Sequence, residues 1–169
     1  MRRFDADPRQ RTDIAADHPK IVEKLRAAYE AYWADLPDQS TTLSRHLLGA
    51  EECPEVMLNG SDWYTGSSPW ASSHFAKGKG GNGTWAVTVL KDGRYEFECR
   101  HFPREADKPI GTTFAKIQVG DVVQEQDLDA SATAARFTLD LKAGDYNLQA
   151  WLGTGKKAPG PLFVYVSAK

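Results

Sequence analysis

The spacing of apolar side chains changes once along this chain, at Pro37, and does not change back. Before Pro37, apolar residues recur every three to four positions, which is the period of an α-helix. After Pro37 they alternate with polar residues, which is the period of a strand with one buried face. We therefore predict two parts: residues 1–37, a polar strip and one helix, and residues 38–169, a mainly β domain.

The helix is predicted to begin at Pro19, because a proline in the first turn removes an N–H group that has no partner there. Asp17 or His18 is its expected cap, and Pro37 stops it. The charged side chains indicate a solvated face. The apolar side chains form a wide stripe that must be buried against something. This stripe consists of Ile21, Val22, Leu25, Ala28, Tyr29, Tyr32, Trp33 and Leu36.

Two turn sequences in the second part predict β-hairpins. Asp92-Gly93 follows Thr88–Leu90 and precedes Tyr95–Phe97, and Asp-Gly supplies the backbone angles of a tight turn. Residues 142–145 separate two further alternating segments, 135–141 and 146–152. Other strands are expected near residues 44–48, 114–119, 122–126 and 162–166. These strands favour a mainly β fold, a jelly-roll-like antiparallel β-sandwich with the helix packed on one side.

Composition excludes several classes of partner. The chain has 169 residues, 41% hydrophobic and 26% charged, which suits one domain with a real core. A formal net charge of -2 without a Lys/Arg cluster argues against nucleic acid. The longest apolar runs are too short to span a membrane. Cys53 and Cys99 match no metal or redox spacing, so we expect free thiols. The compartment stays open.

The first residues resemble a strip near the C-terminus of sulfatases, the arylsulfatase-like, formylglycine-dependent hydrolases. The strip reads Phe4-Asp5, Asp7-Pro8, Thr12-Asp13-Ile14-Ala15 and His18-Pro19. The resemblance continues through segments 59–63, 69–70, 83–87, 93–97, 100–107, 148–152 and 163–166. It implies that the chain is the non-catalytic C-terminal domain of a sulfatase-like sulfuric ester hydrolase, with the catalytic domain as its partner in cis.

The resemblance places the chemistry of that family outside this chain. The formylglycine nucleophile arises within C/S-x-P-x-R, and neither Cys53-Pro54-Glu55 nor Cys99-Arg100-His101 has that spacing. The calcium ligands and sulfate-binding residues of the family also belong to the catalytic domain. The resemblance thus implies no cofactor here, calcium and formylglycine in the parent, and a domain that supports or covers the substrate cleft. A sulfated saccharide is the implied ligand.

The segment from Glu51 to Gly83 is the main candidate site, because a loop this long in a compact domain is usually functional or disordered. Its rings could lie against sugar faces while Asn59, Asp62, Ser67 and His74 exchange hydrogen bonds. The rings belong to Trp63, Tyr64, Trp70, His74 and Trp85. A freestanding carbohydrate-binding β-sandwich is therefore the alternative function. In the rival interpretation the tryptophans only plug the end of the sandwich, and Trp151 is expected in the core.

Arg100 and Arg104 are the second candidate. Their guanidinium groups could hold a sulfate or uronate by paired hydrogen bonds, or they could tie a loop down through ion pairs with Glu105 and Asp107. The four histidines show no ligand spacing, so no metal is expected. No catalytic residue is assigned either, since no nucleophile, base or carboxylate pair stands out.

Overall fold

The computed structural model describes residues 5, 7–36, 43–68, 80–155 and 158–169. The chain divides into two units, residues 1–42 and residues 43–169. The first unit contains α1 (Pro19–Asp35), which begins with Pro19 as predicted and has His18 at its N-cap. None of the α1 residues is buried, and Tyr29 stacks on Trp33 with ring centroids 6.1 Å apart. Packing of α1 on the β domain stays a prediction.

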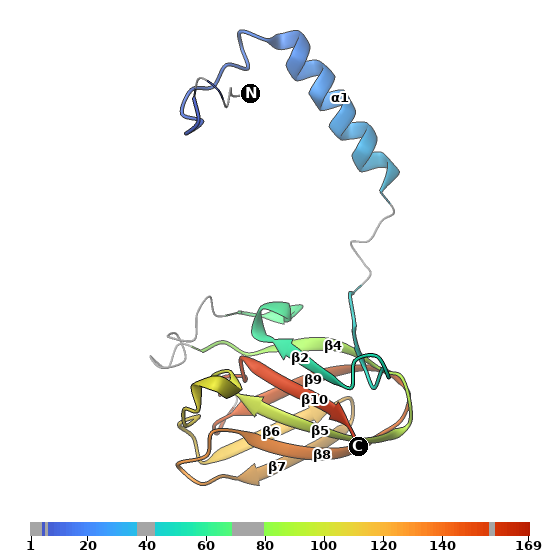
Figure 1. Ribbon diagram of the computed structural model, residues 1–169, viewed down its shortest axis with the longest axis vertical. Coiled ribbons are helices and arrows are strands. Elements are labelled where there is room, and N and C mark those ends of the chain that lie inside the picture. The colour runs from blue at the N-terminus through green and yellow to red at the C-terminus, as the bar shows by residue number, and fades with distance from the viewer. Residues whose placement is uncertain (1–4, 6, 37–42, 69–79, 156–157) are drawn as a thin grey trace. The chain divides into compact units, whose positions relative to one another are not determined.

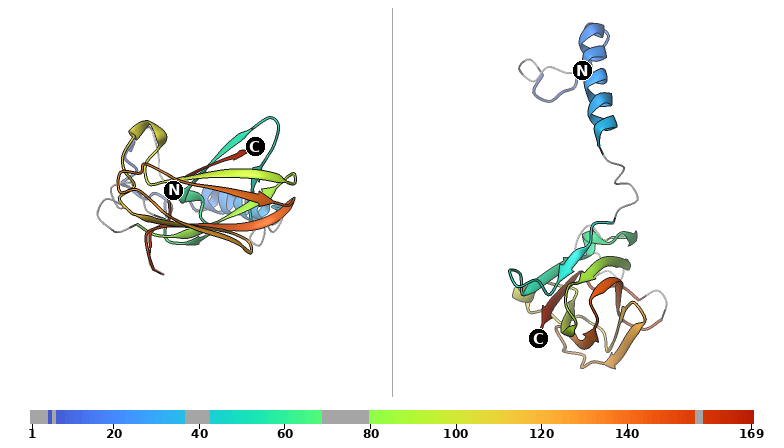
Figure 2. Two further views of the ribbon diagram at one scale, coloured as in Figure 1. Left: turned by 90° about the horizontal axis from the view of Figure 1, so that it is seen from below. Right: turned by 90° about the vertical axis from the view of Figure 1, so that its right-hand side faces the viewer.

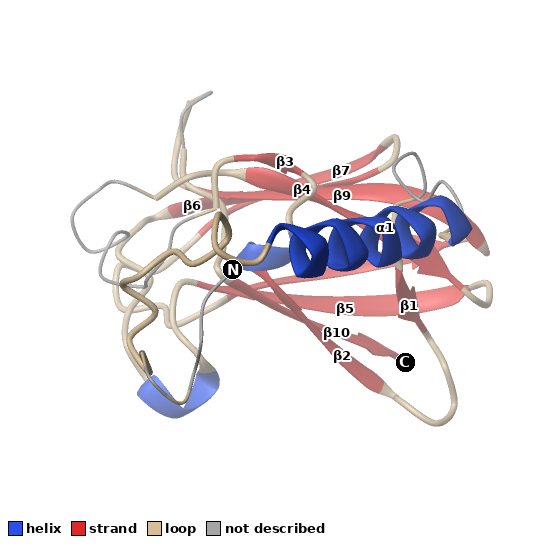
Figure 3. Ribbon diagram, turned by 90° about the horizontal axis from the view of Figure 1, so that it is seen from above, coloured by secondary structure: helices blue, strands red, loops and turns tan. Residues whose placement is uncertain are grey.

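The second unit is a sandwich of two sheets, which confirms the predicted fold class. The first sheet has the order β1 (His46–Leu48), β4 (Gly83–Val89), β9 (Gly144–Leu152), β6 (Phe114–Val119), β7 (Val122–Asp127), and β3 (Thr65–Gly66) pairs with β4. The second has the order β2 (Glu55–Asn59), β10 (Phe163–Ala168), β5 (Gly93–Arg100), β8 (Ala135–Leu141). Two short 3-10 helices, Gly60–Asp62 and Arg104–Ala106, follow β2 and β5. Figures 1 and 3 show the two layers.

The core lies between the sheets, where alternate side chains of both meet. Strand β8 alternates buried and exposed residues along its whole length, and β6 alternates buried and half-buried ones. Trp85 and Phe97, from opposite sheets, are both completely buried. The Nε1 group of Trp85 donates a hydrogen bond to the Asn59 carbonyl oxygen at 2.7 Å, so the first sheet is tied to β2 of the second. The view from below in Figure 2 (left) shows the two sheets as separate layers.

Neither predicted hairpin forms, although the strands lie close to where the pattern placed them. β4 pairs with β9, whereas β5 pairs with β8 and β10, so residues 90–92 cross from one sheet to the other. Residues 142–143 make the same kind of crossing between β8 and β9. Asp92 fastens both crossings together, since its carboxylate accepts hydrogen bonds from Lys142 Nζ and Ala143 N, each at 2.8 Å.

The predicted loop from Glu51 to Gly83 contains regular structure. Residues 55–59 form β2, which pairs with β10 in register from Phe163–Asn59 to Ser167–Glu55. Residues 65–66 form β3 against β4. Short, half-exposed edge strands carry weak alternation, which is why this segment reads as a loop. Residues 69–79 lie outside the described residues.

Two glutamine side chains join the free edges of the two sheets. β7 is the last strand of the first sheet and β8 the last strand of the second. The Nε2 groups of Gln124 and Gln126 donate to the carbonyl oxygens of Thr138 and Arg136, at 3.1 and 2.8 Å. These amides occupy backbone carbonyl oxygens at the edge of β8, which would otherwise be available to pair with another strand.

Candidate functional site

The structure does not support the aromatic loop as a continuous ring surface. Trp85 has no exposed surface, so it belongs to the core and cannot contact a ligand. Trp63 is half-buried and meets Trp85 edge-on, with ring centroids 5.4 Å apart. A Cβ added at Gly83 would lie 2.6 Å from Cγ of Trp63, so the ring sits directly on the backbone of β4. For Trp63 and Trp85, the plug interpretation describes the structure.

The remaining loop candidates have separate roles. Asp62 closes a capping box, because its Oδ2 accepts from Asn59 N at 3.3 Å and Asn59 Oδ1 accepts from Ser61 N at 2.9 Å. Tyr64 is exposed and lines a hollow on the first sheet. Trp70 and His74 lie outside the described residues. Of the predicted loop contacts, Tyr64 is therefore the described residue that reaches a concave surface.

Arg100 and Arg104 are held by carboxylates, but these belong to Glu98 and Glu55 and not to the expected Glu105 and Asp107. Arg100 is buried and its Nη1 donates to Glu98 Oε1 at 2.8 Å. Arg104 donates to both oxygens of Glu55 at 2.8 and 2.9 Å and to Glu98 Oε2 at 3.0 Å. Its guanidinium carbon also lies 4.0 Å from the ring centroid of Tyr165. Their donors are directed at protein carboxylates, so we withdraw the sulfate or uronate site proposed for this pair.

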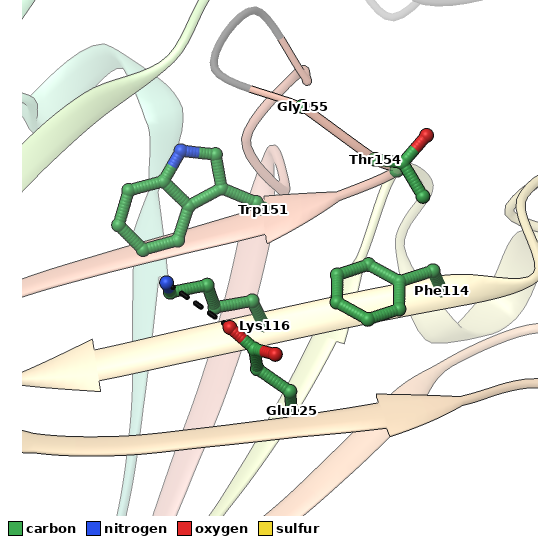
Figure 4. Close-up of a pocket in the computed structure, with 7 residues that line it drawn as sticks. Phe114, Lys116, Glu125, Trp151, Thr154 and Gly155 are labelled. Carbon is green, nitrogen blue, oxygen red and sulfur yellow. Dashed lines mark ion pairs between the residues drawn. The ribbon is translucent and has the colours of Figure 1, made fainter.

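A site that the sequence did not predict lies on the outward side of β6 and β9. Along β9, Leu148, Ala150 and Leu152 are buried, so Trp151 faces away from the core, in contrast to its predicted core position. Lys116 lies opposite Trp151 on β6, with Nζ 5.5 Å from the ring centroid. Lys116 also pairs with Glu125 of β7 at 3.1 Å. Figure 4 shows the ring beside this ion pair.

These residues line a hollow of about 360 Å³, within the range of small-molecule sites. Phe114 of β6 contributes a second ring to its lining. Gly153, Thr154 and Gly155 complete it from the segment after β9. Gly153 and Gly155 have φ of +134° and +84°, conformations that favour glycine and turn this segment sharply at the edge of the hollow.

A second, polar hollow of about 490 Å³ continues along the same strands. Gln118 and Gln149 face each other across β6 and β9, in the row next to Lys116 and Trp151. Asn147 follows Gln149 on the same side of β9. Five outward residues thus form one surface, which we call the β6–β9 face: Lys116, Gln118, Asn147, Gln149 and Trp151.

Internal hydrogen bonds hold the amides of this face in place. Gln118 Nε2 donates to the Gly120 carbonyl oxygen at 2.9 Å, and Gln149 Nε2 donates to Asn82 Oδ1 at 3.1 Å. Asn82 is itself anchored, because its Nδ2 donates to the carbonyl oxygens of Ala150 and Ala158. The side-chain oxygens of Gln118 and Gln149 accept no hydrogen bond from the described residues, so both can accept one from a ligand hydroxyl.

A third hollow, of about 580 Å³, lies at the end of the sandwich and shares Gly153 and Thr154 with the first. His101 contributes to its wall; the residue is 7% exposed and its Nδ1 lies 3.0 Å from the Ile110 carbonyl oxygen. Burial lowers the pKa of His101 to about 4, although the contact with Ile110 opposes this. His101 is therefore neutral at physiological pH.

Other chemistry finds little support in the part of the chain that is described. No group of three or more His, Cys, Asp or Glu residues there could hold a metal ion. Cys53 and Cys99 are free, as predicted, and burial raises the pKa of the Cys99 thiol well above its usual value. Among the described helices, none has the length and apolar character needed to cross a membrane.

No protein-family model matches the chain, and neither does any curated protein. Several solved structures resemble it loosely. A ruminal GH26 endo-beta-1,4-mannanase has 16% identity and a TM-score of 0.45 over 68% of this chain and 26% of the mannanase. A family 35 carbohydrate binding module from Clostridium thermocellum has 17% identity and a TM-score of 0.44, over 68% of this chain and 98% of the module.

The C-terminal CBM6 of a marine laminarinase from Zobellia galactanivorans has 11% identity and a TM-score of 0.39, over 67% of this chain and 98% of that chain. These values describe a distant likeness in fold. The chain spans about a quarter of the mannanase that it resembles. The function of this protein is therefore argued from its own residues.

Proposed function

We propose that the β domain is a saccharide-binding module and that the β6–β9 face is its binding surface. The observation that carries this proposal is Trp151, whose ring lies at an open hollow on a rigid sheet. The CH groups of a sugar ring pack well on a flat aromatic surface, which loses water when they meet. Gln118 and Gln149 lie in the adjacent row, at the right place to exchange hydrogen bonds with sugar hydroxyls.

Rigidity favours binding at this face. Trp151 and Lys116 lie opposite each other on β9 and β6, two inner strands of the first sheet, and Gln149 is held through Asn82. A ligand that docks here orders few protein groups, so less of the contact free energy is lost to conformational entropy. The face also lacks a nucleophile or a buried acid, which suits binding rather than catalysis.

The test is calorimetric titration of the full chain with neutral and acidic oligosaccharides, alongside Trp151→Ala. We expect micromolar to millimolar binding of at least one saccharide and a loss of at least tenfold, about 1.4 kcal/mol, in the variant. Trp33→Ala, an exposed tryptophan of α1, is the matched control and should bind as the wild type does. Binding that survives Trp151→Ala would refute this site.

We propose a second role for residues 19–36, as the surface by which the chain docks on a sulfatase-like catalytic domain in cis. The predicted stripe is exposed on α1: Leu25, Tyr29 and Trp33 have exposed fractions of 57%, 62% and 64%. Isolated apolar residues on a surface are common, but a continuous stripe of large rings indicates an interface. The strip directly before α1 resembles sulfatases in sequence, and this resemblance suggests a sulfatase-like catalytic domain as the partner.

This second role is tested by mixing the chain with a sulfatase-like catalytic domain that lacks its own C-terminal segment. Analytical ultracentrifugation should detect a complex that Leu25→Asp together with Tyr29→Asp abolishes. Lys24→Asp, on the charged face of α1, is the control. If the double variant associates as well as the control does, the stripe is not the docking surface.

A further inference from the structure

The charges around the β6–β9 face determine which saccharides can bind there. Four charged residues line its two hollows: Lys116, Asp121, Glu125 and Asp145. Lys116 is neutralised by Glu125, which lies directly opposite in the register of β6 and β7. Arg45 lies near the far end, but it is neutralised by Asp145 at 3.2 Å. Asp121 forms no ion pair with any described residue, so the surface is net negative.

We infer that the β6–β9 face selects a neutral saccharide and rejects uronic or sulfated ones; this inference rests on the proposed function. An anionic group at the hollow beside Trp151 meets Glu125 as well as Lys116. The Lys116 ammonium has further N–H donors, but an anion that uses them lies close to the Glu125 carboxylate paired with the same ammonium, and this carboxylate repels it. Gln118, Asn147 and Gln149 offer uncharged amides, which match hydroxyl groups without favouring either sign. The sulfated ligand that the sequence implied does not suit this surface.

The ligand is also extended rather than a single sugar. Trp151 and Asn147 are four residues apart on one strand, a separation of about 14 Å at the rise of a β-strand. The row of Lys116 and Trp151 is next to the row of Gln118 and Gln149, so the hollow beside Trp151 and the hollow beside Asn147 lie along the same two strands. A chain that runs along β9 can therefore place one sugar on the Trp151 ring and others over the amides.

Calorimetry on the full chain tests the charge rule with two probes of equal length, a neutral hexasaccharide and a hexagalacturonate. We use the neutral linkage type that binds tightest in the preceding screen. The neutral probe should bind at least tenfold more tightly. Glu125→Gln, which frees Lys116, should raise affinity for the hexagalacturonate at least threefold. Glu105→Gln removes an exposed acid elsewhere and is the control.

The length of the site is tested with a disaccharide and the hexasaccharide of the same linkage. Asn147→Ala should weaken only the longer probe, whereas Trp151→Ala should weaken both. Equal or tighter binding of the hexagalacturonate, or no gain from Glu125→Gln, would overturn the charge rule and leave saccharide binding intact. Binding of neither probe class would overturn the proposed function itself. Equal loss for both lengths in Asn147→Ala would show that the ligand is short.

Discussion

Glu98 should be the most costly charged side chain to remove from this protein. It is 5% exposed and accepts hydrogen bonds from Arg100 at 2.8 Å and from Arg104 at 3.0 and 3.2 Å. Arg100 is 4% exposed, and its remaining described bond runs from Nε to the Phe102 carbonyl oxygen. Glu98→Ala leaves this guanidinium buried without a carboxylate, a situation that typically costs about 3–5 kcal/mol.

Arg104→Ala provides the contrast. The Arg104 side chain is 38% exposed, so solvent screens its ion pairs with Glu55 and Glu98 and can replace them. We expect a loss of about 1 kcal/mol from this variant. The assay is urea unfolding of the full chain at pH 7, followed by tryptophan fluorescence, with Glu98→Gln as the variant of equal volume. The loss of unfolding free energy in Glu98→Gln should lie between the losses in Glu98→Ala and Arg104→Ala.

The result also decides what the arginines do. If Arg104 served to bind sulfate, Arg104→Ala would leave stability unchanged and abolish binding of a sulfated monosaccharide. A loss below about 1 kcal/mol in Glu98→Ala, or a larger loss in Arg104→Ala than in Glu98→Ala, would refute the reasoning, because the burial of Arg100 would then carry no penalty.

Lowering the pH should destabilise the protein through Glu98. Burial raises the pKa of Glu98, but the hydrogen bonds from Arg100 and Arg104 lower it by more than burial raises it. The pKa of Glu98 therefore lies below its usual value of 4.5. A carboxylate whose pKa is depressed by folding stabilises the protein above its unfolded pKa, and this contribution is lost as the pH falls through the folded pKa. The loss should be absent from Glu98→Gln in unfolding curves measured below pH 4.5.

Three further predictions concern the fold around the site. Gly83→Ala should lower the free energy of unfolding by about 1–3 kcal/mol in the same urea assay, because a Cβ there would lie 2.2 Å from a backbone oxygen of β3. Gly93→Ala should keep or gain stability, because its Cβ would have no neighbour nearer than 3.9 Å. Gln124→Ala and Gln126→Ala should each cost about 1 kcal/mol and together promote aggregation, measured by light scattering, since the edge of β8 opens. His101 should make the protein less stable as the pH falls from 6.5 to about 4, by about 3 kcal/mol in total, and thermal unfolding of His101→Gln should lack this slope.

The sequence predicted the strands well and their partners poorly. Alternation is a local property, so β6, β8 and β9 appear close to the predicted positions. Pairing depends on which sheet a strand joins, and that is decided by the whole core. Asp92-Gly93 favours a turn, but the chain on either side of it buries side chains from opposite layers. A local turn preference is therefore compatible with a crossing as well as with a hairpin.

The β6–β9 face is foreshadowed by which residues of one strand are apolar and which are polar. Leu148, Ala150 and Leu152 share one parity, and Asn147, Gln149 and Trp151 share the other. Because one set is entirely apolar and the other contains two amides, the apolar set faces the core and Trp151 lies on the outward side of the strand. Alternation alone, without its phase, predicts a core position for Trp151, which is the wrong face of β9. What the sequence could not provide is the neighbouring strand, which brings Lys116 and Gln118 beside these residues.

The segment from Glu51 to Gly83 gathers aromatic residues, but two of the predicted ligand contacts, Trp63 and Trp85, pack on each other. The glycine of β4 beneath Trp63 shows how closely the ring packs. Trp151 is different, because it lies on the outward side of an inner strand, where its ring contacts Lys116 rather than the core. Trp151 is half-buried and lies at one hollow, and hydrogen-bonding groups line the second hollow in the adjacent row. The proposed saccharide site accounts for that combination, and the proposal therefore rests on Trp151 rather than on the loop.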